Sequence, residues 1–255
     1  MPIAITRAVS ASFADCELTW LPRQPVDIDK AVAQHHEYER CLAEMGAHVI
    51  SLHALEGHPD AVFVEDPALV LDEVAIIATM GCESRRGERE SLANELSKFR
   101  PVRWMRDPVK LEGGDVMRIG RRLFVGLSAR TNEAGVAQLS DETAPFGYSV
   151  TPMNLRDCLH LKSACCPVGG NAILINRDWV DWEPLREFDL IDVVAGEPWA
   201  ANVLRIGDTV LMPSSYPATA AILRAEGYKV RTVDLSELLK AESGVTCSSL
   251  VFRRK

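Results

Sequence analysis

No apolar run in the sequence approaches the roughly eighteen residues that a membrane-spanning helix requires, so we expect no membrane span. Positive charge is also in short supply. The chain has 28 lysines and arginines against 36 aspartates and glutamates, and its formal net charge is −8. Such an acidic chain is not expected to bind nucleic acid, and a small cationic substrate suits it better.

The cysteines lack any spacing pattern that would indicate cross-linking by disulfides or a metal ion. There are seven, an odd number at irregular spacing and without a Cys-x-x-Cys pair, so neither a disulfide framework nor a structural zinc site is indicated. Cys165 and Cys166 are adjacent and are predicted to be packing residues. The first residues run directly into a strand-like pattern, and we expect no signal peptide. The prediction is a reduced, cytoplasmic protein.

What the sequence does have is a repeated unit of strand, turn, strand, helix and strand. The unit is clearest from residues 63, 115 and 202, is weaker near residues 161 and 246, and recurs about every 40–50 residues. The last unit has only its first strand, at residues 246–252, which the strand at residues 3–9 would complete. We therefore predict an α/β fold, a five-bladed pseudo-symmetric propeller closed by both termini. A length of 255 residues allows one large or two small domains, and the ring favours a single domain over residues 1–255.

Between the first strand and the first helix lies a long irregular segment. Residues 10–28 are predicted to form a loop, and a loop of this length in a compact domain is typically functional, such as a mobile lid. A helix is predicted from Asp29 to Met45, followed by Gly46 as its cap and a strand at residues 49–52. Further helices are predicted at about residues 86–98, from about 132, and at about 217–226.

Cys247 lies close to the C-terminus, between hydroxyl residues and ahead of an apolar run. Most cysteines in such a place are small buried hydrophobic residues on a strand. The alternative is a nucleophile at a strand end, where Gly244 lets a substrate approach. That interpretation requires a base, an orienting acid and a binding site elsewhere in the chain.

Charged and nucleophilic residues do recur at matching points of the repeats, namely Glu65, Asp66, Glu112, Asp115, His160 and Cys247. His160 lies in the apolar stretch 158–161, which is predicted to be a strand. There it is either a satisfied core residue or the partner of Cys247 in a thiol–imidazole pair. The other five histidines lie in a helix or near loops and are expected to be solvated or to act as caps.

Seven ordered segments carry a family resemblance: Phe63-Val64-Glu65-Asp66, Glu83-Ser84-Arg85-Arg86-Gly87-Glu88, Glu112-Gly113-Gly114-Asp115, Gly126-Leu127-Ser128-Ala129-Arg130-Thr131-Asn132, Leu159-His160-Leu161-Lys162-Ser163, Ala200-Ala201-Asn202 and Val245-Thr246-Cys247-Ser248-Ser249. Over about residues 3–252 the chain resembles the dimethylarginine dimethylaminohydrolase family of the guanidine-modifying pentein superfamily. The resemblance implies a five-bladed α/β propeller that hydrolyses N-methylated arginine to citrulline and an amine. It implies no metal and no cofactor.

By this resemblance Cys247 is the nucleophile, His160 the general acid and base, and Glu112 the acid that orients His160. The binding residues that the resemblance implies are Asp66 for the guanidinium with Asp60 and Glu65 nearby, Arg85 and Arg130 for the amino-acid carboxylate, and the backbone of Leu18 in the lid for the α-amino group. The partner is a small guanidino amino acid, and the sequence leaves open whether the chain is a monomer or a homodimer.

Three alternatives stay open. Arginine deiminases of the same superfamily place an aspartate two residues after the histidine, where this chain has Lys162. Losing that carboxylate leaves room for N-methyl groups, which favours the methylarginine substrate. An amidinotransferase is disfavoured by the absence of added length for an acceptor site. A non-catalytic propeller that serves as a binding module has no need of Cys247, His160 and Glu112 at matching points.

Overall fold

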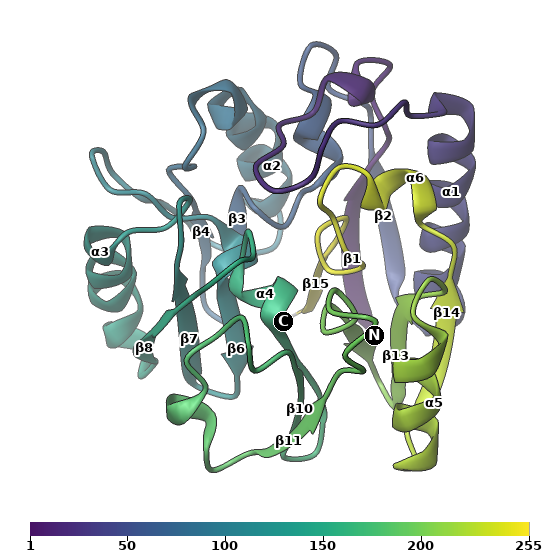
Figure 1. Ribbon diagram of the computed structural model, residues 1–255. Coiled ribbons are helices and arrows are strands. Elements are labelled where there is room, and N and C mark those ends of the chain that lie inside the picture. Colours follow the sequence, from purple (N-terminus) through teal and green to yellow (C-terminus); the bar gives the residue numbers. More distant parts are fainter. Residues whose placement is uncertain (255) are drawn as a thin grey trace.

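The computed structural model describes residues 1–254, within which the strands form five three-stranded sheets arranged as a ring (Figure 1). From the innermost strand outwards, the sheets are β15 (Leu250–Arg253), β1 (Pro2–Arg7) and β2 (His48–Leu52); β3 (Ala68–Val70), β4 (Ala75–Ile77) and β5 (Val102–Trp104); β6 (Val116–Ile119), β7 (Arg122–Leu127) and β8 (Ser149–Asn154); β9 (Cys165–Gly169), β10 (Ala172–Ile175) and β11 (Asp189–Asp192); and β12 (Leu204–Ile206), β13 (Thr209–Pro213) and β14 (Lys229–Val233).

Each sheet is built in the same way. The innermost strand pairs antiparallel with the middle strand, which pairs parallel with the outer one. The middle strands are covered on both faces, and their sequences are accordingly continuous apolar runs such as Ala172–Ile175. The predicted repeat is confirmed, including the two weaker units.

The termini close the ring. β1 pairs antiparallel with β15, with Ile3 opposite Phe252 and Ile5 opposite Leu250, and Figure 1 shows the purple and yellow ends of the chain side by side in one sheet. The prediction that the N-terminal strand completes the last unit is therefore confirmed. The junction is well packed, since the Phe252 ring meets Phe99 edge to face at 5.5 Å.

The helices lie around the outside of the ring, apart from the short α4 near its centre (Figure 1). Their bounds are α1 Ile28–Glu44, α2 Arg89–Leu96, α3 Glu133–Thr143, α4 Leu161–Ala164, α5 Pro217–Ala225 and α6 Ser236–Leu239. α1 begins where the Asp27 carboxylate accepts from the Lys30 N–H at 3.0 Å. The helix predicted at residues 86–98 is shorter than expected, because residues Glu83–Glu88 form a 3₁₀ helix before α2.

One side chain of α1 links the outside of the ring to its centre. Tyr38 lies on the buried face of α1, and its hydroxyl donates to the Val245 carbonyl at 2.6 Å and lies 2.7 Å from the Ser249 hydroxyl. These two residues bracket Cys247. The helix therefore fixes the segment that carries the predicted nucleophile.

The innermost strands enclose a channel of about 750 Å³ that is open to the surface. At the opposite end of the ring, the segment between β1 and α1 crosses the molecule beside the yellow segment that follows α6 (Figure 1). The predicted loop at residues 10–28 is observed, with only a short 3₁₀ helix at Phe13–Asp15. Over residues 1–254, none of the helices has both the length and the apolar character to cross a bilayer.

The ring closure yields a stability prediction. We expect Phe252→Ala to lower the free energy of unfolding by about 3–5 kcal/mol, because it empties a buried site between β15, β1 and Phe99. Urea unfolding followed by circular dichroism measures the change. Arg254→Ala, at an exposed neighbouring position, is the matched control. Equal unfolding midpoints for the two variants would contradict a closing role for β15.

Candidate functional site

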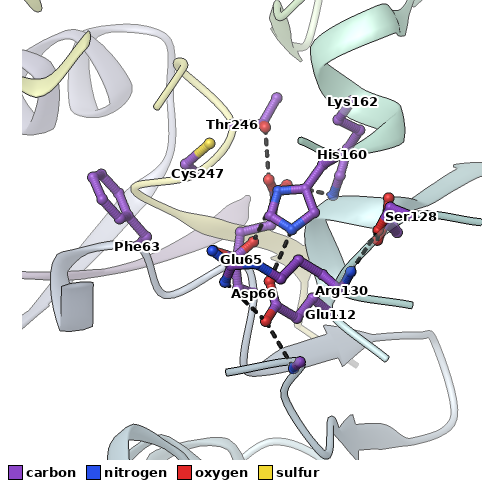
Figure 2. Close-up of polar contacts among 12 residues, drawn as sticks. Phe63, Glu65, Asp66, Glu112, Ser128, Arg130, His160, Lys162, Thr246 and Cys247 are labelled. Carbon is purple, nitrogen blue, oxygen red and sulfur yellow. Dashed lines mark hydrogen bonds and ion pairs between the residues drawn. The ribbon is translucent and has the colours of Figure 1, made fainter. Parts of the chain in front are cut away.

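Corresponding points of the five blades meet at one end of the ring. Asp66, Glu112, His160, Asn202 and Cys247 each lie a few residues before the innermost strand of a different blade. Figure 2 shows side chains from four of these points gathered around one space. The propeller thus brings together residues that are far apart in the sequence, as the repeat predicted.

His160 is held by Glu112. The Nε2 atom of His160 lies 2.8 Å from Oε2 of Glu112, which is fully buried. The other oxygen of Glu112 accepts from the Gly81 backbone N–H at 2.9 Å and from Nη1 of Arg130 at 3.4 Å. Since Glu112 occupies Nε2, the Nδ1 atom of His160 is left facing the side on which Cys247 lies (Figure 2).

Opposite charges reverse the effect of burial on this pair. Burial would lower the pKa of His160, but the charges of Asp66 and Asp115 and the hydrogen bond with Glu112 outweigh it and raise the pKa to about 9. Burial would likewise raise the pKa of Glu112, but the hydrogen bond and charge of His160, with Arg85 and Arg130, hold it below its ordinary value. Near neutral pH the pair is therefore an imidazolium bonded to a carboxylate.

One of the two carboxylate oxygens of Asp66 is hydrogen-bonded to a buried arginine. Its Oδ2 accepts from Nη1 of Arg85 at 2.7 Å, while the Nε and Nη2 atoms of Arg85 donate to the two oxygens of Glu88 at 3.0 and 2.9 Å. The Oδ1 atom of Asp66 is buried, lies 3.8 Å from Nδ1 of His160, and has no hydrogen-bond partner among residues 1–254. A buried carboxylate oxygen without a donor is suited to binding a cation.

Cys247 does not lie on a strand, and the prediction of a strand at residues 246–252 is wrong at its start. β15 begins at Leu250, and Cys247 lies in a turn in which the Ser249 N–H donates to the Thr246 carbonyl at 3.3 Å. The Gly244 N–H donates to the sulfur at 3.2 Å. Burial, together with the charges of Glu65 and Asp66, raises the pKa of the thiol well above its ordinary value.

The side chain of Asn202 explains why the strand starts late. Its carbonyl accepts from the Thr246 N–H at 3.0 Å, so that N–H is not available to a ladder. Its amide donates to the Thr246 hydroxyl and to the Lys162 carbonyl, joining the turn of Cys247 to the segment of His160. A Cβ on Gly244 would lie 2.2 Å from the Asn202 side chain, so only glycine fits there.

His160 is not on a strand either. It is the residue before α4, whose first N–H, at Leu161, donates to the buried Asp115 carboxylate at 3.0 Å. Asp115 also accepts from the Ser128 hydroxyl at 2.7 Å, and burial raises its pKa to about 6. The predicted strand is wrong here because the acceptor that starts the helix comes from the neighbouring blade, 46 residues away in the chain.

Glu65 lies in the wall between this site and the central channel. Its carboxylate is 2.5 Å from Nζ of Lys162 and accepts from the Thr246 hydroxyl at 2.6 Å, so both oxygens are paired. Its backbone N–H donates to the Cys247 carbonyl at 3.1 Å. Glu65 borders the channel, whereas Asp60 and Asp66 border the pocket.

The pocket itself is small. Its lining comprises Glu17, Asp60, Phe63, Asp66, Arg85, Arg130, Leu159, His160, Ala241, Glu242, Ser243 and Cys247. Its volume is about 20 Å³, which is room for about one water molecule. Both oxygens of Asp60 accept from the Glu17 N–H, at 3.1 and 3.3 Å. The neighbouring side chain of Leu18 packs against the core cluster that contains Tyr38.

A sequence model described as N,N dimethylarginine dimethylhydrolase, eukaryotic, matches residues 20–189. The N(G),N(G)-dimethylarginine dimethylaminohydrolase of Pseudomonas aeruginosa is 36% identical over 89% of this chain and 90% of its own length. The chain belongs to the dimethylarginine dimethylaminohydrolase family. The Streptomyces coelicolor relative of the same name is 34% identical over 98% of this chain and 96% of its own length.

The fold of this family member agrees with a solved relative. A cysteine-to-serine mutant of the Pseudomonas aeruginosa dimethylarginine dimethylaminohydrolase, complexed with citrulline, superposes with a TM-score of 0.93. It is 34% identical and the match covers 98% of both chains. The predicted pentein fold is confirmed.

Three donors of the site could hold a metal ion. Asp66, Glu112 and His160 each offer one possible ligand atom, and these three atoms lie within 4.8 Å of one another. Arg85, Arg130 and His160 already pair with three of the four carboxylate oxygens, however, and among residues 1–254 only Oδ1 of Asp66 is left without a partner, which is too few ligands for a metal ion. The donor set therefore suits a guanidinium at Asp66 better than a metal ion.

Sequence reasoning missed the supports of the site in this family member. Asn202, Asp115, Glu88 and Glu242 have no predicted role, although the first three lie inside the segments that carry the family resemblance. His35 was expected to be solvated or to act as a cap, but it lies on the core face of α1. Burial lowers its pKa to about 4.

The approach of His160 to Asp66 depends on Gly114. A Cβ at this position would lie 2.6 Å from Nδ1 of His160 and 2.7 Å from Oδ1 of Asp66. We expect Gly114→Ala to displace the imidazole, so that in nuclear magnetic resonance titrations its pKa falls from about 9 toward the ordinary value of about 6.5.

The matched control is Gly196→Ala, because a Cβ at Gly196 has no neighbour within 4 Å. It should leave the His160 titration as in the wild type. A wild-type titration in a folded Gly114→Ala protein would show that the close contact does not hold the ring.

Proposed function

We propose that the protein hydrolyses asymmetric dimethylarginine and monomethylarginine to citrulline and the corresponding amine through a covalent intermediate on Cys247. One observation carries the proposal: the pocket joins the Cys247 thiol, a His160 bonded to Glu112, and the Oδ1 of Asp66, which has no hydrogen-bond partner in the described part of the chain. Hydrolysis of a guanidine needs a nucleophile, an acid–base group and an anionic site for the cation. The similar enzymes of Pseudomonas and Streptomyces are named for this activity.

The substrate is bound by ion pairs at both of its ends. Asp66 binds the guanidinium through Oδ1, and Arg85 and Arg130 bind the α-carboxylate. The hydrogen bonds of Arg130 within the pocket are long, 3.4 Å to Glu112 and 3.3 Å to the Thr19 hydroxyl, so a carboxylate can compete for them. Leu18 meets the α-amino group through its carbonyl, while Asp60 and Glu65 act through the neighbours they hold.

The chemical step uses the protonation states of the free site. Near neutral pH the Cys247 thiol is neutral and His160 is protonated. The bound guanidinium lowers the pKa of the thiol, whose proton leaves to solvent. The thiolate attacks the guanidinium carbon. His160 then donates its Nδ1 proton to the departing amine as the C–N bond breaks, leaving an S-alkylthiouronium.

Hydrolysis reverses the role of His160. The neutral imidazole keeps its proton on Nε2, where Glu112 accepts it, and Nδ1 removes a proton from water. The resulting hydroxide attacks the thiouronium carbon, the C–S bond breaks, and the hydroxyl proton of the adduct passes to the departing sulfur, which releases citrulline and restores the Cys247 thiol. Glu112 stabilises the imidazolium of the first step and fixes the tautomer of the second.

Three wider proposals accompany the reaction. Residues 1–255 act as a single hydrolase domain, because all five blades contribute to one site. The reaction takes place in the cytoplasm, where the seven free cysteines stay reduced. A homodimer is compatible with such a self-contained site, and light scattering of the purified protein distinguishes it from a monomer.

N-methylated arginines should be better substrates than arginine. Where deiminases carry a second carboxylate, this chain has Lys162, whose ammonium is bound by Glu65. We expect kcat/KM to be higher for dimethylarginine and monomethylarginine than for arginine, measured by citrulline formation. Cys247→Ala should lower turnover by about a thousandfold or more without unfolding the protein. Faster hydrolysis of arginine would favour a deiminase, and an active Cys247→Ala variant would exclude the covalent route.

A further inference from the structure

We propose that Glu242 is a positioning residue that holds the lid closed over the pocket. The inference rests on the proposed function only for its kinetic readout. The lid is defined as residues 16–21, which lie between β1 and α1. Glu242 comes from the segment after α6, and it lines the same pocket.

Three consecutive backbone N–H groups of the lid converge on this one carboxylate. The Thr19 N–H lies 3.0 Å from both oxygens of Glu242, the Leu21 N–H donates to Oε1 at 2.5 Å, and the Trp20 N–H donates to the same oxygen. The carboxylate lies in a residue that is only 7% exposed. Hydrogen bonds from backbone donors to a buried anion are stronger than those to a neutral acceptor.

Other contacts hold the lid less directly. The Glu17 N–H donates to Asp60, the Ser84 hydroxyl donates to Glu17 at 2.6 Å, and Arg130 donates to the Thr19 hydroxyl. Each of these involves a single lid group. Glu242 alone among these partners is bonded to three residues in a row, so the position of the lid backbone depends most on it.

The pocket beneath the lid cannot admit an amino acid in this closed state. A volume of about 20 Å³ has room for about one water molecule. The lid must therefore move away for a substrate to reach Cys247, and it must return if the backbone of Leu18 is to meet the α-amino group. Opening breaks the bonds to Glu242 and closing restores them.

Glu242 lies next to the turn that carries the nucleophile. It precedes Cys247 by one short turn, and the intervening Gly244 N–H donates to the sulfur. The backbone of Glu242 has φ of 56°, a left-handed conformation that is unfavourable for any residue other than glycine. Such a conformation persists where surrounding contacts impose it, which fits a side chain fixed by the lid.

The test compares Glu242→Ala and Glu242→Gln with the wild type and with Glu226→Gln, a matched control at the exposed end of α5. Hydrogen–deuterium exchange of peptides that cover residues 17–21 reports lid opening directly. Steady-state kinetics with dimethylarginine gives KM and kcat separately. Alkylation of Cys247 by 2-chloroacetamidine, which has no α-amino group and spans only the guanidinium site, reports on the nucleophile.

In Glu242→Ala we expect exchange in residues 17–21 to become about 10- to 100-fold faster and KM to rise by a similar factor, because hydrogen bonds to a charged group are lost. We expect kcat to fall less than KM rises, and alkylation to be at least as fast as in the wild type, because the reagent also reaches Cys247 only when the lid is open. Glu242→Gln retains one acceptor oxygen, so its exchange rate and KM should lie between those of the wild type and Glu242→Ala. Glu226→Gln should have the wild-type exchange rate and KM.

Wild-type exchange at residues 17–21 in a folded Glu242 variant would overturn the proposal. So would a loss of alkylation in parallel with KM, because that result would assign Glu242 to the structure of the nucleophile turn. If Glu242→Ala does not fold, Glu242→Gln decides by the same readouts. A protein that hydrolyses no methylarginine refutes the proposed function, yet exchange and alkylation still test the lid contact.

Discussion

The site is organised by a buried network in which positive and negative groups alternate. Arg85 joins Glu88 to Asp66, Asp66 faces His160, His160 is bonded to Glu112, and Glu112 also meets Arg130. The free-energy cost of burying any one of these six charged groups without a partner would be prohibitive. Removing one partner would leave a buried charge uncompensated, at a cost on the order of 3–5 kcal/mol. The network therefore fixes the protonation states and the geometry together.

The propeller makes this network possible because it brings segments from successive blades together at one end of the ring. Asp66, Glu112 and His160 belong to three successive blades, and Asn202 ties the fourth to the turn that carries Cys247. Burial, together with the negative charges of Glu65 and Asp66, raises the pKa of the Cys247 thiol and keeps it neutral in the free protein. In the proposed reaction, activation of the nucleophile depends on a cation arriving at Asp66, which confines thiolate formation to a site already holding a guanidinium.

Much of the fold and the central side chains could be predicted from sequence, because both depend on periodic signals. The repeat placed Asp66, Glu112, His160 and Cys247 at matching points, and the structure brings them together. Local sequence patterns gave the wrong secondary structure where a side chain far away in the sequence determines the backbone conformation. Asp115 starts α4 beside His160, and Asn202 delays β15 behind Cys247. Glu242 carried no local signal, since its partners lie more than 200 residues away in the chain.

Activation of Cys247 by the charge of its own ligand is the central claim, and alkylation as a function of pH tests it most directly. Neutral iodoacetamide and cationic 2-chloroacetamidine are compared on the wild-type protein, with the modified cysteine identified by peptide mapping. The raised pKa of the thiol predicts that iodoacetamide modifies Cys247 only in strongly alkaline solution, whereas the cationic reagent modifies it near neutral pH. Rapid modification of Cys247 by both reagents at neutral pH would show a thiolate already present in the free protein, and would contradict the account.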